Sequence, residues 1–436
     1  MDNLAVIDRN LRWFRNSGVL LKDGLEGVCE RARLLDREHP IVNGNRLQQD
    51  GLFKYVRVDC VLQTATLFAL ADNLFPSRGY KYVSDNLLKF IKETPFQENR
   101  LDHSEFGLFA HGLTFDYAFP VKMIVEKNPT VRHYKDNKYF WDKKWPDDNS
   151  WAVILPLALW ANGYSDELRD YSLLAAQSLL DKREILDKYA RNKMDGMPHW
   201  GGMRAMALAY VYGLTEDERF KDESLNSLQK DLEAIDDFDK GKREQPYDLS
   251  NCGYFVMEAS TVADVTKDDK VIRGLDIVAK YLISRQSEDG HWPGEWWEGS
   301  SGEHIADLVY GQNWATLGLQ SYTQFTDDKK ARESVKKSLE FLTSIQNKSD
   351  FAKTDGAWLG SYDAKRKTWG GEDRVEGGIS SMYTGWTNAP ISIALITDYT
   401  ETRSILLPRN NPKVDLFSYG KIVAQYDKHK LEIDKR

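Results

Sequence analysis

Two groups of acidic residues attract attention because aromatic side chains surround them. Asp147 and Asp148 come directly before a long apolar run, and Glu295 lies between Trp292 and Trp296. A carboxyl group walled by indole rings is expected to have a raised pKa, which a general acid needs at neutral pH. A second, ionised carboxylate completes the pair that cleaves a glycosidic bond. We therefore predict Asp148 and Glu295 as catalytic carboxylates, with Asp147 as a further candidate.

Both positions also have a plainer structural interpretation. Adjacent acids at the start of a helix commonly cap it or interact with the positive end of its dipole. Glu295 is equally typical of an exposed loop. A catalytic role requires Asp148 and Glu295 to project into one cavity although they lie far apart in the sequence. Their separation would then decide between retention and inversion, about 5–5.5 Å against 6.5–9.5 Å.

Aromatic residues gather in the same connections as the acids. The chain has 13 Trp, and most of them lie in these connections. Trp and Tyr present a flat apolar face with a polar edge, which suits the stacking and hydrogen bonding of a sugar ring, although any single Trp could simply pack a core. Beside His199, two glycines let a ligand approach closely. The predicted substrate-binding residues of this kind are His199, Trp200, His291, Trp292, Tyr310, Asn313, Tyr383 and Trp386.

The sequence contains no motif for a metal or cofactor. The three cysteines stand singly, without CxxC spacing, so neither a disulfide framework nor a thiolate metal site is indicated. No HExxH motif is present. The histidines of the aromatic connections are His103, His111, His199, His291 and His304. With a net charge of −8 and dispersed Lys and Arg, we expect no metal, no cofactor and no nucleic-acid partner.

The elements that must position these residues are predicted from a repeat of turns. Each turn has a Ser or Thr followed by acids, at Ser165, Thr215, Thr266 and Thr326. A Ser or Thr oxygen accepts the free N–H groups of a helix start, and acids suit the helix dipole, so each turn marks a new helix. The segments before the turns, such as 151–160 and 203–210, are apolar on nearly every face, whereas those after them, such as 330–339, carry charges on one side. Inner and outer helices therefore alternate.

Helix pairs with a period of about 50 residues form either an open solenoid or a closed ring, since one pair cannot bury its own apolar stripe. Further pairs are predicted at 60–74 with 78–94 and around 381–398, with a weaker helical pattern at 4–36. No polar capping repeat is visible, which favours a closed ring. We predict an all-α, (α/α)6-type toroid. Because no Pro/Gly/Ser-rich linker interrupts the chain, residues 1–436 are predicted to form this single catalytic domain.

The N-terminal residues lack a basic region followed by an apolar stretch, and no segment reaches the ~18 apolar residues that a membrane span needs. We expect a soluble protein without membrane insertion. It would be cytoplasmic as the sequence stands, or periplasmic or secreted if a signal peptide has been removed.

Several short motifs occur in an order that resembles a known group. They are Pro146-Asp-Asp-Asn-Ser-Trp-Ala152, Pro198-His-Trp-Gly-Gly202, Asp289-Gly-His-Trp292, Asp307-Leu-Val-Tyr-Gly-Gln-Asn-Trp314, Asp355-Gly-Ala-Trp358 and Tyr383-Thr-Gly-Trp386. Over roughly residues 50–400 they resemble bacterial six-hairpin (α/α)-toroid glycosidases, chiefly the exo-β-glucuronidase-like branch. The resemblance implies an oligosaccharide or polysaccharide substrate, removal of a terminal β-linked glucuronic acid, and no cofactor. A uronate needs a cationic partner, for which Arg57, Arg204 and Arg374 are the candidates.

Other activities stay open. Unsaturated uronyl hydrolases are more distant relatives, because their Arg-Gly-x-x-Trp-like helix start reads Tyr310-Gly-Gln-Asn-Trp314 here. Gln286 with Trp292, and Gln346 with Trp358, are similar to the Gln-Trp repeats of class II terpene cyclases, but 147–149 lacks the full Asp-x-Asp-Asp motif of those enzymes. Polysaccharide lyases, sugar epimerases and non-catalytic glycan-binding proteins are further alternatives, since a fold does not define a function.

Overall fold

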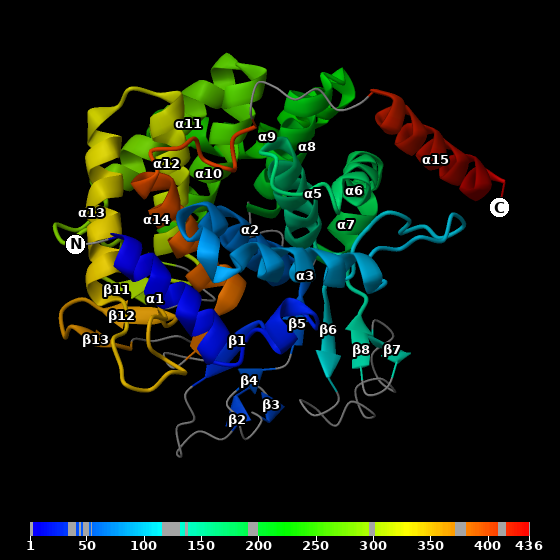
Figure 1. Cartoon of the computed structure of the whole chain (residues 1–436). Helices are drawn as coiled ribbons and strands as arrows, with labels where there is room; N and C mark the ends of the chain where they lie inside the picture. Colours follow the sequence, from blue (N-terminus) through cyan, green and yellow to red (C-terminus); the bar gives the residue numbers. More distant parts are fainter. Residues whose placement is uncertain are drawn as a thin grey trace.

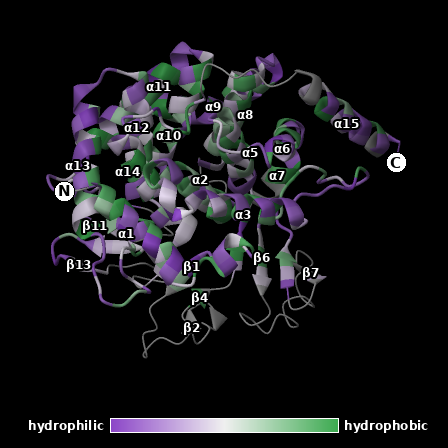
Figure 2. Ribbon diagram, viewed as in Figure 1, coloured by the Kyte–Doolittle hydropathy of each residue, from purple (hydrophilic) through white to green (hydrophobic). Residues whose placement is uncertain are grey.

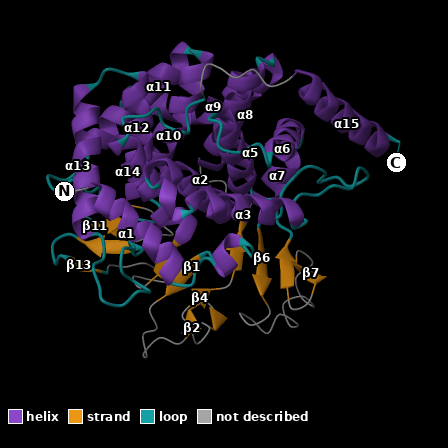
Figure 3. Ribbon diagram, viewed as in Figure 1, coloured by secondary structure: helices purple, strands orange, loops and turns teal. Residues whose placement is uncertain are grey.

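The computed structural model describes residues 3–33, 41–42, 45–46, 52–53, 55–115, 131–135, 138–190, 199–295, 301–370, 381–408 and 416–435. Helices make up the body of the molecule, and short strands gather at one end of it (Figure 3). None of the described helices combines the length and the apolarity that a membrane span requires.

Six helices form an inner ring within the described residues. Most of their residues are buried, and many of those on α10 and α14 are hydrophobic (green in Figure 2). Each contacts the next along the chain, and the last contacts the first, so the ring is closed (Figure 1). The inner helices are α2 (Val58–Leu74), α5 (Pro146–Ala161), α8 (His199–Thr215), α10 (Leu249–Thr266), α12 (Gln312–Phe325) and α14 (Ala389–Tyr399).

An outer helix packs against each inner one. The last hairpin joins the two ends of the chain, because α1 packs on α14 and Asn10 donates hydrogen bonds to Gly356 O (2.8 Å) and Asn388 Oδ1 (2.9 Å). The predicted (α/α)6 toroid is confirmed. The outer helices are α3 (Tyr80–Glu93), α6 (Arg169–Asp181), α9 (Glu218–Asp239), α11 (Asp269–Ser284), α13 (Lys329–Ile345) and α1 (Asn3–Asn16). Outside this ring lie α7 (Arg183–Ala190) and α15 (Leu416–Asp434), which packs on α6 (Figure 1).

The turns lie where the repeat predicts them, but the capping residue is different. Asp217, Asp268 and Asp328 are the N-caps of α9, α11 and α13; for example, Asp268 Oδ1 accepts from the N–H groups of Lys270 (2.9 Å) and Val271 (3.1 Å). The preceding Thr instead ends the inner helix, because its hydroxyl donates to the carbonyl four residues before it. The prediction that Ser or Thr caps the next helix is therefore wrong. At the Ser165 turn, α6 has no side-chain cap.

The Gln-Trp motifs join neighbouring outer helices. Gln286, just after α11, donates to Ser334 O of α13 (3.0 Å), and Gln346, at the end of α13, donates to Val6 O of α1 (2.9 Å). The indole N–H of Trp292 donates to a carbonyl of α11 (2.9 Å). These contacts give the Gln-Trp motifs a structural role, that of joining the outer helices.

The strands lie at the end of the ring where the inner helices begin, and most of them precede such a helix (Figure 1). β5 ends at Arg57 and pairs with β6, so that Arg57 faces Gly112 and Val58 N donates to His111 O (3.3 Å). The sheets have the orders β14-β1-β4, β5-β6-β8-β7, β11-β12-β13, β10-β9 and β2-β3. The strands are β1 (Arg31–Arg33), β2 (Ile41–Val42), β3 (Asn45–Arg46), β4 (Leu52–Phe53), β5 (Tyr55–Arg57), β6 (Gly112–Phe115), β7 (Val131–Lys135), β8 (Lys138–Trp141), β9 (Gly294–Glu295), β10 (Ser301–Gly302), β11 (Ile305–Asp307), β12 (Ser361–Asp363), β13 (Thr368–Trp369) and β14 (Ser381–Tyr383).

The opposite end of the ring is covered by the segment that follows α14. Residues 404–407 are buried there. Thr261 Oγ1 of α10 donates to Leu406 O (3.0 Å), and Tyr210 OH of α8 donates to Ile405 O (3.4 Å). Because both donors lie in the C-terminal halves of their helices, this segment closes the ring opposite the strands.

Candidate active site

A buried cluster of charges lies at the junction of β5 and α2. The guanidinium of Arg57 contacts three carboxylates: Asp148 Oδ1 (2.9 Å), Asp59 Oδ1 (3.1 Å) and Glu30 Oε1 (3.4 Å). The side chain of Arg57 is 10% exposed, whereas those of Asp59 and Asp148 are fully buried. The ring of Trp386 covers the guanidinium, with its centroid 4.8 Å from the Arg57 Cζ. One cation thus holds together residues from three separate segments of the chain.

Asp148 uses both carboxylate oxygens in this cluster. Oδ1 accepts from Arg57, and Oδ2 is hydrogen-bonded to His111 Nδ1. Burial alone would raise the pKa of Asp148, but His111 and Arg57 outweigh that effect and lower it, so Asp148 is ionised at neutral pH. The N-cap of α5 is Trp145, which makes no side-chain cap hydrogen bond. The contacts of Asp148 to other segments therefore support a functional interpretation over capping.

The pKa values of Asp147 and Asp59 are raised, whereas that of Asp148 is lowered. Burial and the charge of Asp148 raise the pKa of Asp147 to about 8. Burial also raises the pKa of Asp59 to about 7, against the opposing effect of Arg57. Asp147 Oδ1 and Asp59 Oδ2 have no hydrogen-bond partner within the described structure. A neutral Asp147 next to an ionised Asp148 is the arrangement that lets one site supply an acid and a base.

A stack of aromatic rings crosses the interior of the ring beside these carboxyls. His199 of α8 stacks on Tyr254 of α10 (centroids 4.6 Å apart), Tyr254 on Trp314 of α12 (5.2 Å), and Trp314 on Trp151 of α5 (5.9 Å). Trp151 lies one helical turn after Asp147, on the same face of α5. Burial, followed by the charge of Asp147, raises the pKa of Tyr254, which agrees with this proximity. Tyr254 and Trp314 are covered on both sides by their neighbours in the stack, so the stack forms an aromatic wall beside the carboxyls.

Several buried polar atoms of the inner ring have no hydrogen-bond partner in the part of the chain that the structure describes. Toward the beginnings of their helices they are Asp59 Oδ2, both amide atoms of Gln63, Thr64 Oγ1, Asp147 Oδ1, Asn251 Oδ1, Tyr254 OH, Asn313 Oδ1 and Trp386 Nε1, and further along they are Glu258 Oε1 and Gln320 Oε1. They come from α2, α5, α10, α12 and the π-helix η5 (Thr384–Asn388). Leaving a buried polar group without a partner costs about 1–3 kcal/mol, so proteins rarely leave several together. The unpaired atoms toward the strand end of the ring are therefore candidates for hydrogen bonds to a polar ligand.

The structure brings many of the predicted site residues together. Arg57, Asp147 and Asp148 belong to the charge cluster, as described above. Asn313 Nδ2 donates to Trp386 O, and the ring of Tyr310 meets that of Trp386 edge-on (6.0 Å). The neighbouring Tyr383 accepts at its hydroxyl from Arg31 Nη1 (2.8 Å), across the β1–β14 pair. His199 joins this group through the aromatic stack.

The structure shows no contact between the predicted Glu295 and the charge cluster among the described residues. Glu295 instead forms an ion pair with Arg285 (2.6 Å). Trp296 lies outside those residues. The pairing of Asp148 with Glu295 therefore stays a prediction.

Four more predicted residues lie toward the outside of the ring. Arg204 contacts Glu223 of α9 (2.6 Å) and Leu179 O of α6 (2.9 Å). His291 is bonded to Asp289 (2.5 Å), and Trp292, described above, is tied to α11. The fourth is Trp200, whose ring lies 5.2 Å from that of Trp145. Arg374 falls outside the described residues, so its predicted role stays a prediction.

Sequence reasoning did not select Asp59, Gln63 or Tyr254 as site residues, and it noted His111 only as one of the histidines in the aromatic connections. His111 reaches Asp148 only because β6 pairs with β5. Gln63 and Tyr254 lie on helices that are buried on every side, so no hydrophobic periodicity shows which residues face the interior. The one available signal was Arg57-Val-Asp59, a charged triplet at the start of an apolar helix.

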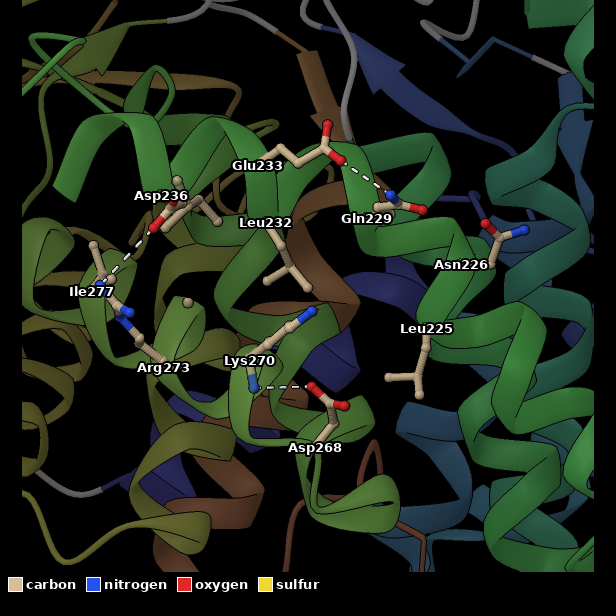
Figure 4. A pocket seen from close by; sticks show the side chains of 12 residues that line it. Leu225, Asn226, Gln229, Leu232, Glu233, Asp236, Asp268, Lys270, Arg273 and Ile277 are labelled. Atoms are coloured by element: carbon tan, nitrogen blue, oxygen red, sulfur yellow. Dashed lines mark hydrogen bonds and ion pairs between the residues drawn. The ribbon is translucent and has the colours of Figure 1, made fainter. Parts of the chain in front are cut away.

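A groove of about 580 Å³ lies outside the ring, between α9 and α11 (Figure 4). Leu232 and Ile277 contribute to its walls. Its polar groups serve the helices themselves: Gln229 donates to Glu233 (3.1 Å), and Asp268 caps α11. We assign no site there. Among the described residues, no group of three or more His, Cys, Asp or Glu side chains is placed to hold a metal ion.

Replacing Asp147 with Asn is expected to raise the thermal stability of the protein increasingly from pH 5 to pH 8. The unfolded Asp releases its proton near pH 4, whereas the folded one holds it to about pH 8. A raised folded pKa gives stability that is present below the unfolded pKa and is lost as the pH rises through the folded one. The wild type therefore loses up to about 1.4 kcal/mol per pH unit over this interval, and Asn does not. Melting curves of both proteins across this range measure the difference; parallel curves would contradict the raised pKa.

The closed double ring, with an acidic and aromatic site at its strand end, defines the protein as an (α/α) toroid. No family model and no curated protein sequence matches the chain. Solved structures do match. Cellobiose 2-epimerase from Bacillus thermoamylovorans B4167 has a TM-score of 0.55 at 14% identity, covering 91% of this chain and 100% of that one.

Unsaturated glucuronyl hydrolase from Bacillus sp. GL1 matches with a TM-score of 0.56 at 11% identity, covering 94% of this chain and 100% of that one. A D-mannose isomerase matches with a TM-score of 0.54 at 10% identity, over 91% and 97%. The expected likeness to (α/α)-toroid sugar enzymes is thereby confirmed for the fold. Because neighbours with different activities match about equally well, the fold does not choose among those activities.

Proposed function

We propose that this protein is a carbohydrate-active hydrolase that removes a terminal sugar from an oligosaccharide or polysaccharide. The observation that carries the proposal is the neutral Asp147 beside the ionised Asp148, facing the aromatic stack inside a closed ring. Glycoside cleavage needs one carboxyl group that donates a proton and another that is ionised. At neutral pH Asp147, kept protonated by the neighbouring Asp148, supplies the proton donor, and Asp59, with a pKa of about 7, supplies the ionised carboxylate in a substantial fraction of the molecules.

In the proposed mechanism Asp147 is the general acid. Its proton passes to the glycosidic oxygen as the bond from that oxygen to the anomeric carbon breaks. Asp59, whose pKa of about 7 leaves a substantial fraction of it ionised at neutral pH, is the general base: in that form its open Oδ2 takes a proton from the water whose oxygen attacks the anomeric carbon. Asp148 stays ionised and keeps the pKa of Asp147 high. Glu295 remains an untested second carboxylate.

The shape of the ring supports action on a terminal unit. Residues 404–407 cover the end opposite the strands, so a sugar chain would enter from the strand end with its last unit deepest. We keep β-linked glucuronate as the first sugar to test. However, Arg57 is already shared among three carboxylates of the protein, so recognition of a uronate needs a further cation such as Arg374. Neutral β-glucosides therefore belong in the same test.

A sugar epimerase or isomerase is the second candidate, favoured by the hydrogen bond between His111 and Asp148. A histidine oriented by a carboxylate is an effective general base, which can remove a proton from the carbon beside a sugar carbonyl. Two of the similar structures are named as a cellobiose 2-epimerase and a mannose isomerase. The two candidates differ in product, because epimerisation breaks no glycosidic bond.

The test is a panel of aryl β-glucuronides, aryl β-glucosides, Δ4,5-unsaturated uronyl disaccharides and free cellobiose or mannose, with a geranylgeranyl substrate as the cyclase control. We expect the wild type to release the aryl group and Asp147→Asn to lose this activity. Asp236→Asn, a control on the outer helix α9, should retain it. Activity only on the unsaturated disaccharides would indicate that the enzyme hydrates a double bond rather than hydrolysing a glycoside directly. Conversion of cellobiose or mannose without cleavage would support the epimerase or isomerase, and no reaction with any sugar would contradict both candidates.

A further inference from the structure

Gln63 of α2 has no assigned role in this mechanism, yet neither its Nε2 nor its Oε1 has a hydrogen-bond partner among the described residues. Its side chain is buried, at 2% exposed. The buried Gln312, by contrast, is fully used: it donates to Gly290 O (3.1 Å) and Ser338 Oγ (2.8 Å) and accepts from Trp292 N (2.9 Å). Gln320 leaves its Oε1 unpaired among the described residues but donates to Ala394 O (3.0 Å), so only Gln63 has both amide atoms unpaired among the buried glutamines described. A completely unpaired buried amide is unusual in a folded protein.

Helix geometry places Gln63 on the inside of the ring. The outward face of α2 is set by Ala65, whose carbonyl accepts from Ser84 Oγ of α3 (2.9 Å), and by Phe68, whose ring packs on Tyr80 of α3 (5.4 Å). At about 100° per residue, Gln63 lies roughly opposite both positions. It also lies one turn after Asp59, on the same face and toward the closed end of the ring.

We propose that Gln63 determines the sugar specificity of this site by binding two neighbouring hydroxyl groups of the terminal sugar. Its amide offers an N–H donor and a C=O acceptor side by side, which matches the acceptor and donor of a vicinal diol. The inference rests on the proposed function insofar as the ligand is a sugar. It holds equally for hydrolysis and for epimerisation, because the amide binds the ring and takes no part in the bond changes.

The test is Gln63→Met, which keeps the length of the side chain and removes both hydrogen-bonding groups. We expect the melting temperature to rise, because an unpaired buried amide is lost, and kcat/KM to fall about 100-fold on the preferred sugar. Removing one of the two hydroxyls from the sugar should lower the kcat/KM of Gln63→Met much less than it lowers the kcat/KM of the wild type. A structural glutamine would give the opposite change in melting temperature.

Gln346→Met is the matched control. Gln346 is as buried (4% exposed), but its amide donates to Val6 O (2.9 Å) and Gly356 O (3.0 Å). This variant should melt at a lower temperature and keep its kcat/KM. Gln63 has no specificity role if Gln63→Met also melts at a lower temperature than the wild type. The same holds if removal of the hydroxyl lowers kcat/KM equally for the wild type and for Gln63→Met.

If the wild type converts no sugar, the proposed function fails, and binding of glucose, mannose and glucuronate by ligand-observed NMR replaces kinetics. If the wild type binds a sugar and Gln63→Met binds it more weakly, the role of Gln63 is supported independently of catalysis. Equal binding by both proteins, or no binding by either, overturns it.

Discussion

Replacing Asp148 with Asn is expected to lower kcat/KM by about 10²–10⁴-fold while the ring of helices stays folded. The Asp148 carboxylate accepts from Arg57 and is bonded to His111, and its negative charge helps to raise the pKa of Asp147. Without that charge the pKa of Asp147 falls. The proposed acid then loses its proton at neutral pH, and His111 loses its charged partner.

The pH dependence of kcat/KM on a substrate from the panel measures this effect. In the wild type, activity should decline as the pH rises through about 8, where Asp147 ionises; in Asp148→Asn the decline should move to lower pH. Circular dichroism and melting curves check folding, and Asp236→Asn serves as the exposed control. A capping role makes a different prediction, a loss of ~1 kcal/mol in stability with activity retained. That outcome would remove Asp148 from the proposed mechanism.

Replacing Arg57 with Leu is expected to reduce the free energy of unfolding by about 3–5 kcal/mol at pH 8. The change leaves Glu30, Asp59 and Asp148 buried without their shared cation. Arg57 lowers the pKa values of Asp59 and Asp148, so its loss raises both in the folded state. Since a raised folded pKa gives stability that is lost as the pH rises, the defect should be largest at pH 8 and smaller at pH 5.5.

Melting curves of wild type and Arg57→Leu at pH 5.5 and pH 8 test this expectation. The matched control is Arg273→Leu, which removes an arginine with an ion pair to Asp239 (2.6 Å) but with a side chain that is 63% exposed. Such surface pairs contribute about 0–1 kcal/mol, with little dependence on pH in this range. If the two variants are destabilised equally at both pH values, the buried cluster does not depend on Arg57.

The hydrophobic pattern predicted the helical ring correctly, because each helix pair must bury an apolar stripe that only its neighbours can cover. The helix boundaries at 60–74 and 78–94 agree closely with α2 and α3. The pattern did not predict the short strands of two to five residues, which have too few positions to show an alternation. It also assigned the caps to Thr266 and its equivalents, because both Thr and Asp are common capping residues and only backbone geometry separates them.

The sequence by itself determined the fold class and pointed to Asp147, Asp148 and Arg57, because periodicity and local composition are written along the chain. Only the tertiary structure decided that adjacent acids have opposite protonation preferences. Successive helical residues point about 100° apart, so Asp148 meets Arg57 and His111 while Asp147 faces the aromatic stack. Likewise, Gln63 and its neighbours on α2 are all buried, so only closure of the ring decides which of them faces its interior.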